Sequence, residues 1–187
     1  TSPFNNTGAG AQVQAQNNIK IETIGFMNQA GAVIISGANT VINSVTSFFN
    51  YATIQSIGDL TITSADVENK GILAGADTNI TADTFSNAGG EAQIQAAGDL
   101  RITVNQGDLN NTSGETIYSA GDTNLKVAGT LNNNASLIQA GSLLVTATDV
   151  ENSAGASIIA KTGELNVSAN SLSNSGLLTG SNTSINT

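Results

Sequence analysis

A large apolar residue followed two positions later by asparagine recurs nine times along the 187-residue chain. The nine asparagines are Asn6, Asn28, Asn50, Asn69, Asn87, Asn111, Asn133, Asn152 and Asn174. Successive members lie 18 to 24 residues apart from one end of the chain to the other. A period of roughly 20 to 50 residues is typical of solenoids, propellers and arrays. The chain is therefore expected to fold as a stack of similar units of about 20 residues each.

Two further apolar steps lie between successive asparagines. One is apolar-x-small, as in Ile94–Ala96, and the other is apolar-x-apolar, as in Leu100–Ile102. Both alternate with a period of two, which indicates a strand, and both are too short for a helix. Turns that contain glycine, such as Ala97–Asp99, separate the two steps. Each unit is therefore predicted to form three short strands joined by tight turns.

The fold that stacks such units is all-β, a parallel β-helix of about nine coils with roughly 20 residues in each. A single unit cannot bury its apolar face, whereas neighbouring units bury it against one another. A leucine-rich repeat would need a helical half in every unit, and a propeller would need about 40 residues per blade. We expect a single domain over residues 1–187, excised from a longer chain.

Stacking also predicts two inner columns, each with one residue from every coil. The first column contains Phe4, Phe26, Phe48, Val67, Phe85, Leu109, Leu131, Val150 and Leu172. The second is expected to contain Ile19, Ile42, Leu60, Ile80, Leu100, Leu125, Leu143, Leu165 and Ile185. The nine asparagines are expected to act as structural anchors, because stacked amides bond to the backbone and to one another at turns.

The composition excludes several classes of site. Without cysteine or histidine there is no thiolate or imidazole metal site, no cysteine nucleophile and no Ser-His-Asp triad. Five basic residues against fourteen acidic ones give a net charge of −9, which argues against nucleic acid and anionic membranes as partners. No apolar run approaches the roughly 20 residues that cross a bilayer, so no membrane insertion is expected. We expect neither catalysis nor a cofactor.

The repeat units resemble those of a known family. Gly58–Thr63 followed by Val67–Asn69, and likewise Ile94–Ile102, are similar to the haemagglutinin repeats of filamentous-haemagglutinin-like and contact-dependent growth inhibition exoproteins. The resemblance covers essentially the whole chain. It implies a right-handed β-helix in a long two-partner-secretion protein, secreted to the surface of a Gram-negative bacterium. It also implies three partners: flanking repeats of the same chain, an outer-membrane transporter during export, and a cell-surface receptor.

Acidic residues recur near one turn of successive units: Asp59, Asp77, Asp99, Asp122 and Glu164. Stacked carboxylates of this kind can share Ca²⁺. The alternative, which we favour, is that Gly-Asp is ordinary turn chemistry, because the Gly-Gly-x-Gly-x-Asp motif of calcium-binding β-rolls is absent.

A polysaccharide-cleaving enzyme, in which paired carboxylates flank the bond to be cut, is a remote alternative. The acids lie mostly in turns, one per coil, rather than around a cleft. Lys20, Arg101 and Lys126 are expected to share one outward position, with Arg101 and Lys126 on neighbouring coils. The scattered positions of the basic residues favour a solvated face over a groove for an anionic sugar.

One group of apolar residues is expected on the outside of the stack. The middle residue of the asparagine pattern should face solvent and is mostly polar, but Met27 and Phe49 break this rule on adjacent coils. Tyr51 follows closely, and Val45 should point outward just before the same corner. Methionine and aromatic residues on a polar surface are typical of binding sites. Two alternatives are a bulge that turns Phe49 rather than Phe48 inward, and cover from a flanking segment.

The leading hypothesis is therefore a structural rod segment of a secreted or surface adhesin or contact-dependent inhibition protein, a class associated with virulence. The second is an adhesive module that binds a receptor through Met27, Val45, Phe49 and Tyr51.

Overall fold

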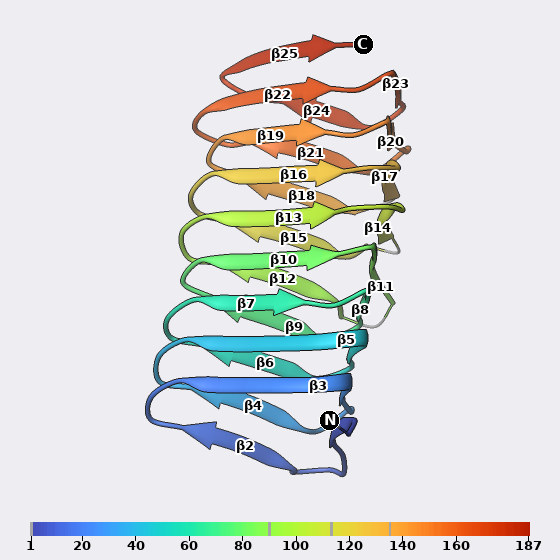
Figure 1. Cartoon of the computed structure of the whole chain (residues 1–187). Helices are drawn as coiled ribbons and strands as arrows, with labels where there is room; N and C mark the ends of the chain where they lie inside the picture. The colour runs from blue at the N-terminus through green and yellow to red at the C-terminus, as the bar shows by residue number, and fades with distance from the viewer. Residues whose placement is uncertain (1, 90, 113, 135) are drawn as a thin grey trace.

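The computed structural model describes residues 2–89, 91–112, 114–134 and 136–187, and within these ranges the chain contains strands and no helix. The strands wind into one stack of about nine coils with about 21 residues per coil (Figure 1). Equivalent strands of neighbouring coils pair in parallel. The predicted all-β parallel solenoid is confirmed.

One face of the stack is a nine-stranded sheet, which we name the rear sheet because it lies behind the other strands in Figure 1. Its strands, in spatial and chain order, are β2 (Gln12–Ala15), β4 (Val33–Ser36), β6 (Thr53–Ser56), β9 (Ile72–Gly75), β12 (Gln93–Ala96), β15 (Thr116–Ser119), β18 (Leu137–Ala140), β21 (Ser157–Ala160) and β24 (Leu177–Thr179). They correspond to the apolar-x-small steps of the sequence.

The other strands form a 16-stranded sheet with two walls. The front wall contains β7 (Leu60–Thr63), β10 (Thr78–Ala82), β13 (Leu100–Val104), β16 (Thr123–Val127), β19 (Leu143–Thr146), β22 (Glu164–Ser168) and β25 (Asn182–Asn186). The side wall contains β1 (Phe4–Asn6), β8 (Asp66–Asn69), β11 (Thr84–Ala88), β14 (Leu109–Thr112), β17 (Thr130–Asn134), β20 (Asp149–Asn152) and β23 (Ser171–Asn174). Two long strands, β3 (Ile19–Asn28) and β5 (Thr40–Asn50), pass round the corner and join the walls.

The register of the side wall confirms the first predicted column. Three of its aromatic rings stack: the centroids of Phe4 and Phe26 lie 5.3 Å apart, and those of Phe26 and Phe48 lie 4.6 Å apart. Stacking of identical units thus brings like side chains together along the axis of the solenoid.

The second predicted column is wrong, because the register divides its members between two columns two residues apart. One column contains Ile19, Thr40, Leu60, Thr78, Leu100, Thr123, Leu143, Leu165 and Thr183. The other contains Ile21, Ile42, Ile62, Ile80, Ile102, Leu125, Val145, Val167 and Ile185.

Threonine is buried in the first of these columns where its hydroxyl finds a partner, which lies inside the same coil for Thr40 and Thr123 and is the Gln95 carbonyl of the next coil for Thr78. The Thr40 and Ser36 hydroxyl oxygens lie 2.7 Å apart, as do those of Thr123 and Ser119. A hydroxyl that is hydrogen-bonded in this way is buried at little cost. An apolar pattern alone therefore does not identify these inner positions.

Candidate functional site

The nine asparagines form a continuous ladder at the corner between the side wall and the rear sheet, which we name the asparagine corner. Each side-chain Nδ2 donates to Oδ1 of the asparagine one coil further on, over 2.8 to 2.9 Å, in eight consecutive bonds. The same Nδ2 atoms lie 3.1 to 3.4 Å from backbone carbonyl oxygens of the rear sheet. Every member from Asn6 to Asn152 is buried, whereas Asn174 is exposed.

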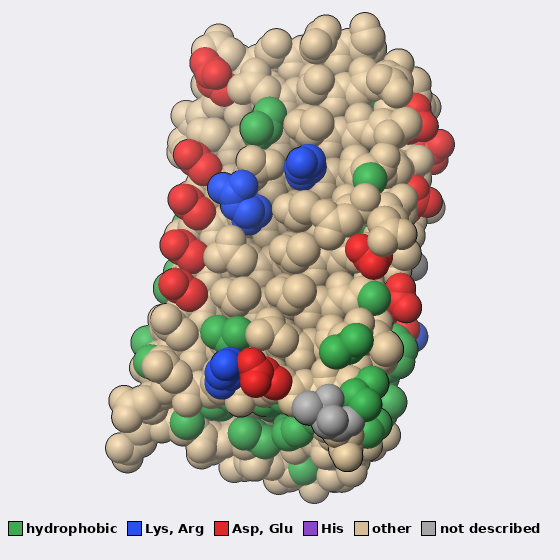
Figure 2. All heavy atoms as spheres, viewed as in Figure 1, with side chains coloured by type: hydrophobic (Ala, Val, Ile, Leu, Met, Phe, Trp, Pro, Cys, Tyr) green, Lys and Arg blue, Asp and Glu red, His purple; other side chains and the backbone are tan. Residues whose placement is uncertain are grey.

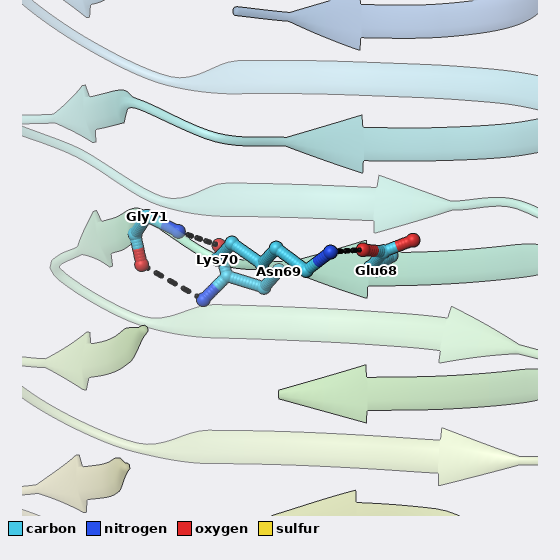
Figure 3. A network of polar contacts seen from close by, with 4 residues as sticks. All are labelled: Glu68, Asn69, Lys70 and Gly71. Atoms are coloured by element: carbon cyan, nitrogen blue, oxygen red, sulfur yellow. Dashed lines mark hydrogen bonds and ion pairs between the residues drawn. The ribbon is translucent and has the colours of Figure 1, made fainter. Parts of the chain in front are cut away.

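Figure 3 shows how one member of this ladder also holds the turn that follows it. The Asn69 amide donates to the Gly71 carbonyl over 3.0 Å, and the Gly71 N–H donates back to Asn69 Oδ1 over 3.3 Å. Such an Asx-type turn satisfies backbone groups that the end of a strand would otherwise leave unpaired. The asparagine therefore links neighbouring coils and fixes the direction of the chain at the corner.

A second ladder runs along the corner between the rear sheet and the front wall, which we name the acidic corner. Its members are Asn18, Asn39, Asp59, Asp77, Asp99 and Asp122, and the acidic ones lie along the left edge of Figure 2. From Asn39 onward, the backbone N–H of each member donates to Oδ1 of the member one coil before it, over 2.8 to 3.4 Å. Glu164 lies in the same column beyond Asp122, with Ser142 between them.

The recurrence of Gly-Asp at this corner has a steric cause. A Cβ atom on Gly98 would overlap Oδ1 of Asp77, and one on Gly121 would overlap Oδ1 of Asp99. Glycine therefore lets the chain approach the carboxylate closely. Asp77 is preceded by alanine, and its N–H makes the longest bond of the ladder, 3.4 Å. This bonding accounts for the carboxylates as turn chemistry, the interpretation that the sequence favours over a shared Ca²⁺ ion.

Among the described residues, no group of three or more acidic side chains is placed to hold a metal ion. A shallow depression of about 660 Å³ lies beside the acidic corner and is lined by Asp77, Asp99, Arg101, Asp122 and Glu164, among others. Its carboxylates stand one per coil in a row, and Oδ1 of Asp77 and of Asp99 accepts a backbone N–H.

The predicted alignment of basic residues is wrong in part. Lys20 and Arg101 do share a column, but Arg101 pairs with Asn124, and Lys126 pairs with Thr103. Leu125 aligns with Ile102 rather than with Leu100, which moves Lys126 two residues along the strand.

Met27 and Phe49 lie side by side on the outer surface of the side wall, in one column with Glu68. Phe48 is fully buried, so the bulge that would have turned Phe49 inward does not occur. The rings of Phe49 and Tyr51 stack with centroids 6.4 Å apart. We name Met27, Phe49 and Tyr51 the aromatic cluster.

An ion pair borders the aromatic cluster on its carboxyl-terminal side. The Lys70 ammonium lies 5.3 Å from the centre of the Tyr51 ring and pairs with Glu68 (Figure 3). The hydrogen bond to Glu68 raises the pKa of Lys70 above its usual value of 10.5. A shallow groove of about 290 Å³ continues past Phe49, lined by outward residues that include Glu68, Ser86 and Asn110. Sequence reasoning missed Glu68 and Lys70, although each lies one coil beyond a residue of the cluster.

Val45 lies apart from the aromatic cluster. It is 69% exposed, at the bend of β5 where pairing with β3 shifts register, and its apolar neighbour in that bend is Ile24, which is 40% exposed. At about 3.3 Å per residue, a strand would place Val45 roughly 13 Å from Phe49. Hydrophobic side chains are visible over the ends of β3 and β5 at the lower right of Figure 2. Val45 therefore lies at the bend, whereas the aromatic cluster lies beyond it on the side wall, and Ile24 is an addition at the bend.

Comparison with known proteins agrees with the repeat. The family model described as haemagglutinin repeat matches residues 5–66, 47–103 and 95–187, which together span nearly the whole chain. Neither a curated protein nor a solved structure matches the chain significantly. The described residues contain no helix that is long and apolar enough to cross a membrane. Proteins with this repeat are structural or adhesive and are typically secreted or surface-exposed. On its sequence and its fold, this chain belongs to the haemagglutinin-repeat family and is a filamentous-haemagglutinin-like repeat region.

Proposed function

We propose that this chain is a structural rod segment of a large adhesin-type or contact-dependent inhibition exoprotein at the surface of a Gram-negative bacterium. The observation that carries the proposal is the unbroken asparagine ladder, whose eight bonds connect nine successive coils. Because each coil is bonded and packed on its neighbours alone, the stack is stiff along its axis and can be extended by adding coils. Such a rod holds other functional parts of a protein away from the cell.

The proposed rod has no catalytic role. The carboxylates of the acidic corner are spaced one per coil, and four of the five ladder bonds there lie between 2.8 and 3.1 Å. A rod also needs partners, and we propose flanking repeats of the same chain at its ends and an outer-membrane transporter during export. Ile185, which continues an inner column and is about half exposed on the last strand, is a residue that a further coil would cover.

Single-molecule pulling between the two termini tests the rod. We expect the chain to resist extension and to lengthen in steps that correspond to one coil or a few coils, because each coil must break its own ladder bonds. Smooth extension at low force would contradict the proposal.

A second candidate function is adhesion through the aromatic cluster. Phe49 and Tyr51 form a stacked pair on the outer surface, and a charged pair and a shallow groove lie next to them. Interaction surfaces are enriched in aromatic residues and methionine. We propose that a receptor on a neighbouring or host cell is the ligand in this case.

Cell binding by the purified chain tests adhesion. The Met27→Asp/Phe49→Asp variant is compared with wild type on intact bacterial and epithelial cells. Asn132→Asp/Ser173→Asp is the matched control, because it adds the same charges to the same outward column beyond the groove. Saturable binding that is lost only in the first variant supports a receptor site at the cluster. Binding that is unchanged in both variants, or absent in wild type, contradicts it.

A further inference from the structure

The rear sheet differs from the rest of the surface in its charge. The protein has five basic and fourteen acidic residues and a net charge of −9. In the described part of the chain, none of these residues belongs to the nine strands of the rear sheet. The charged side chains lie instead on the two walls and in the turns. One long face of an acidic protein is therefore electrically neutral.

The outward positions of the rear sheet combine apolar side chains with amides and hydroxyls. Val33, Ile35, Ile72, Tyr118, Leu137 and Ile159 alternate along their strands with residues that the core buries, such as Ile34 and Ile158, and so point outward. Most other outward positions are occupied by Gln, Thr or Ser. The strand order of this sheet is uninterrupted from β2 to β24, so the face is long and continuous.

We propose that two copies of this chain pair side by side through their rear sheets. Two chains of charge −9 repel each other, and the repulsion is smallest where the opposed surfaces carry no charge. A strongly charged partner would find no complementary charge on this face, whereas a second copy presents the same neutral mixture of side chains. The rear sheet is therefore the face on which a second copy meets the least repulsion.

A two-fold axis parallel to the stack keeps the coils of the two faces in register. It places each coil opposite the same coil of the second copy and exchanges the two outward columns. Val33 then faces Ile35 of the second copy, and Gln93 faces Gln95 of the second copy. In these coils like side chains meet, whereas in other coils an apolar residue faces a polar one, as Leu137 faces Gln139 and Ser157 faces Ile159.

The size of the face predicts a weak dimer. Nine strands about 4.8 Å apart and four residues of about 3.3 Å each make a face of roughly 43 by 13 Å. Two such faces together amount to roughly 1,100 Å², just below the lower limit of about 1,200 Å² for stable specific interfaces. We therefore expect pairing that depends on concentration, with dissociation in the micromolar to millimolar range.

Sedimentation velocity over a range of concentrations tests the pairing. The Ile35→Asp/Ile159→Asp variant places two charges on the rear sheet of each copy. The matched control, Val41→Asp/Leu144→Asp, places two charges at outward positions of the front wall. We expect wild type and the control to shift from monomer to dimer as concentration rises, and the rear-sheet variant to remain monomeric. Circular dichroism establishes that all three retain the β fold.

Three results would overturn the proposal: a wild type that is monomeric at every concentration, a rear-sheet variant that dimerises as well as wild type does, or equal loss of dimer in both variants. Small-angle scattering separates this dimer from association at the ends of the rod. Side-by-side pairing enlarges the cross-section and keeps the length of the monomer. A dimer of twice the length contradicts it. None of these results depends on whether the chain is a rod segment of an adhesin.

Discussion

The two corners of the solenoid are held by ladders of different kinds. At the asparagine corner, side chain bonds to side chain in the interior, and the same residue type occupies the position in all nine coils. At the acidic corner, a side-chain oxygen accepts a backbone N–H near solvent, and Asn and Asp interchange between Asn18 and Asp122. The acidic ladder ends after Asp122, where Ser142 takes the next position.

The difference follows from the hydrogen-bond donors and acceptors that each ladder requires in a side chain. A buried ladder of side chains needs a donor and an acceptor in every residue, and the Asn amide supplies a carbonyl acceptor and two N–H donors, enough to bond both the next side chain and the backbone. A ladder that accepts only backbone N–H groups needs one oxygen, which Asp and Asn both supply. Burial also makes an unpaired polar atom costly at the asparagine corner, whereas water replaces a lost bond at the acidic corner.

The largest loss in the free energy of unfolding is expected from Asn69→Ala. The change removes the acceptor of Asn50, the donor to Asn87 and both bonds to Gly71 in a buried position. Leaving two or three buried polar groups unpaired should lower the free energy of unfolding by about 3–5 kcal/mol. Chemical denaturation measures the loss. Asn43→Ala, an exposed asparagine of β5, is the control and should cost less than about 0.5 kcal/mol.

A pair of glycine substitutions compares the corners directly. At the asparagine corner, a Cβ on Gly71 would overlap the backbone N and O of Ala52, which cannot move without disturbing the coil below. Gly71→Ala should therefore cost about 2–3 kcal/mol. At the acidic corner, a Cβ on Gly98 would meet only the end of the Asp77 side chain, which can rotate into solvent.

Gly98→Ala should thus cost about 1 kcal/mol, the value of the bond between Asp77 and the Asp99 N–H. Thermal or denaturant unfolding of the two variants checks the order. Equal losses would mean that the two corners are equally rigid, and our distinction between them would be incorrect.

The same distinction explains which parts of the molecule the sequence predicts. The asparagine corner and the column from Phe4 to Leu172 are recognisable because an asparagine recurs in every coil with a large apolar residue two positions before it. The inner column with Thr40 and Thr123 is hidden, because an apolar pattern misses its threonines, and these two are paired with serines four residues earlier. Because the prediction overlooked those threonines, it placed Leu125 in the wrong inner column and Lys126 two residues away from its observed alignment.

The candidate site was predictable only in part. The outward direction of Met27 and Phe49 follows from alternation along the strand. The separation of Val45 does not, because it depends on the bend that β3 and β5 make where the other coils break into two strands. The ion pair of Glu68 and Lys70 beside Tyr51 depends in turn on the register between coils of different length.

One buried acid at the asparagine corner, Glu115, should make the free energy of unfolding depend on pH. Glu115 is only 4% exposed, and burial raises its pKa above the usual 4.5, although backbone hydrogen bonds from Gly89 and Ala92 oppose the shift. The folded state therefore holds this proton at pH values where the unfolded chain has lost it. Its contribution to stability is greatest below pH 4.5 and falls as pH rises through the raised pKa.

Glu115→Gln keeps the size of the side chain and removes its charge. We expect the variant to be more stable than wild type at neutral pH, and the difference to shrink as pH falls towards 4.5. Denaturation midpoints of both proteins across this range check the sign. A difference that grows on acidification would show that the Glu115 carboxylate is better accommodated than its burial indicates.

The smallest effect on the free energy of unfolding is expected from serine hydroxyls just before the acidic corner, where not every interior hydroxyl is hydrogen-bonded. Ser36 donates to the Ala38 carbonyl and bonds Thr40. Its neighbour one coil on is Ser56, and in that coil Leu60 takes the position of the threonine. Among the described residues, the Ser56 hydroxyl is one of two buried side-chain groups without a hydrogen-bond partner.

Ser56→Ala should therefore leave the free energy of unfolding unchanged or raise it by up to about 1 kcal/mol, whereas Ser36→Ala should lower it by about 1 kcal/mol. Parallel denaturation of the two variants measures both signs. A loss at Ser56 as large as that at Ser36 would mean that its hydroxyl is satisfied, and that this corner requires its polar groups as strictly as the asparagine corner does.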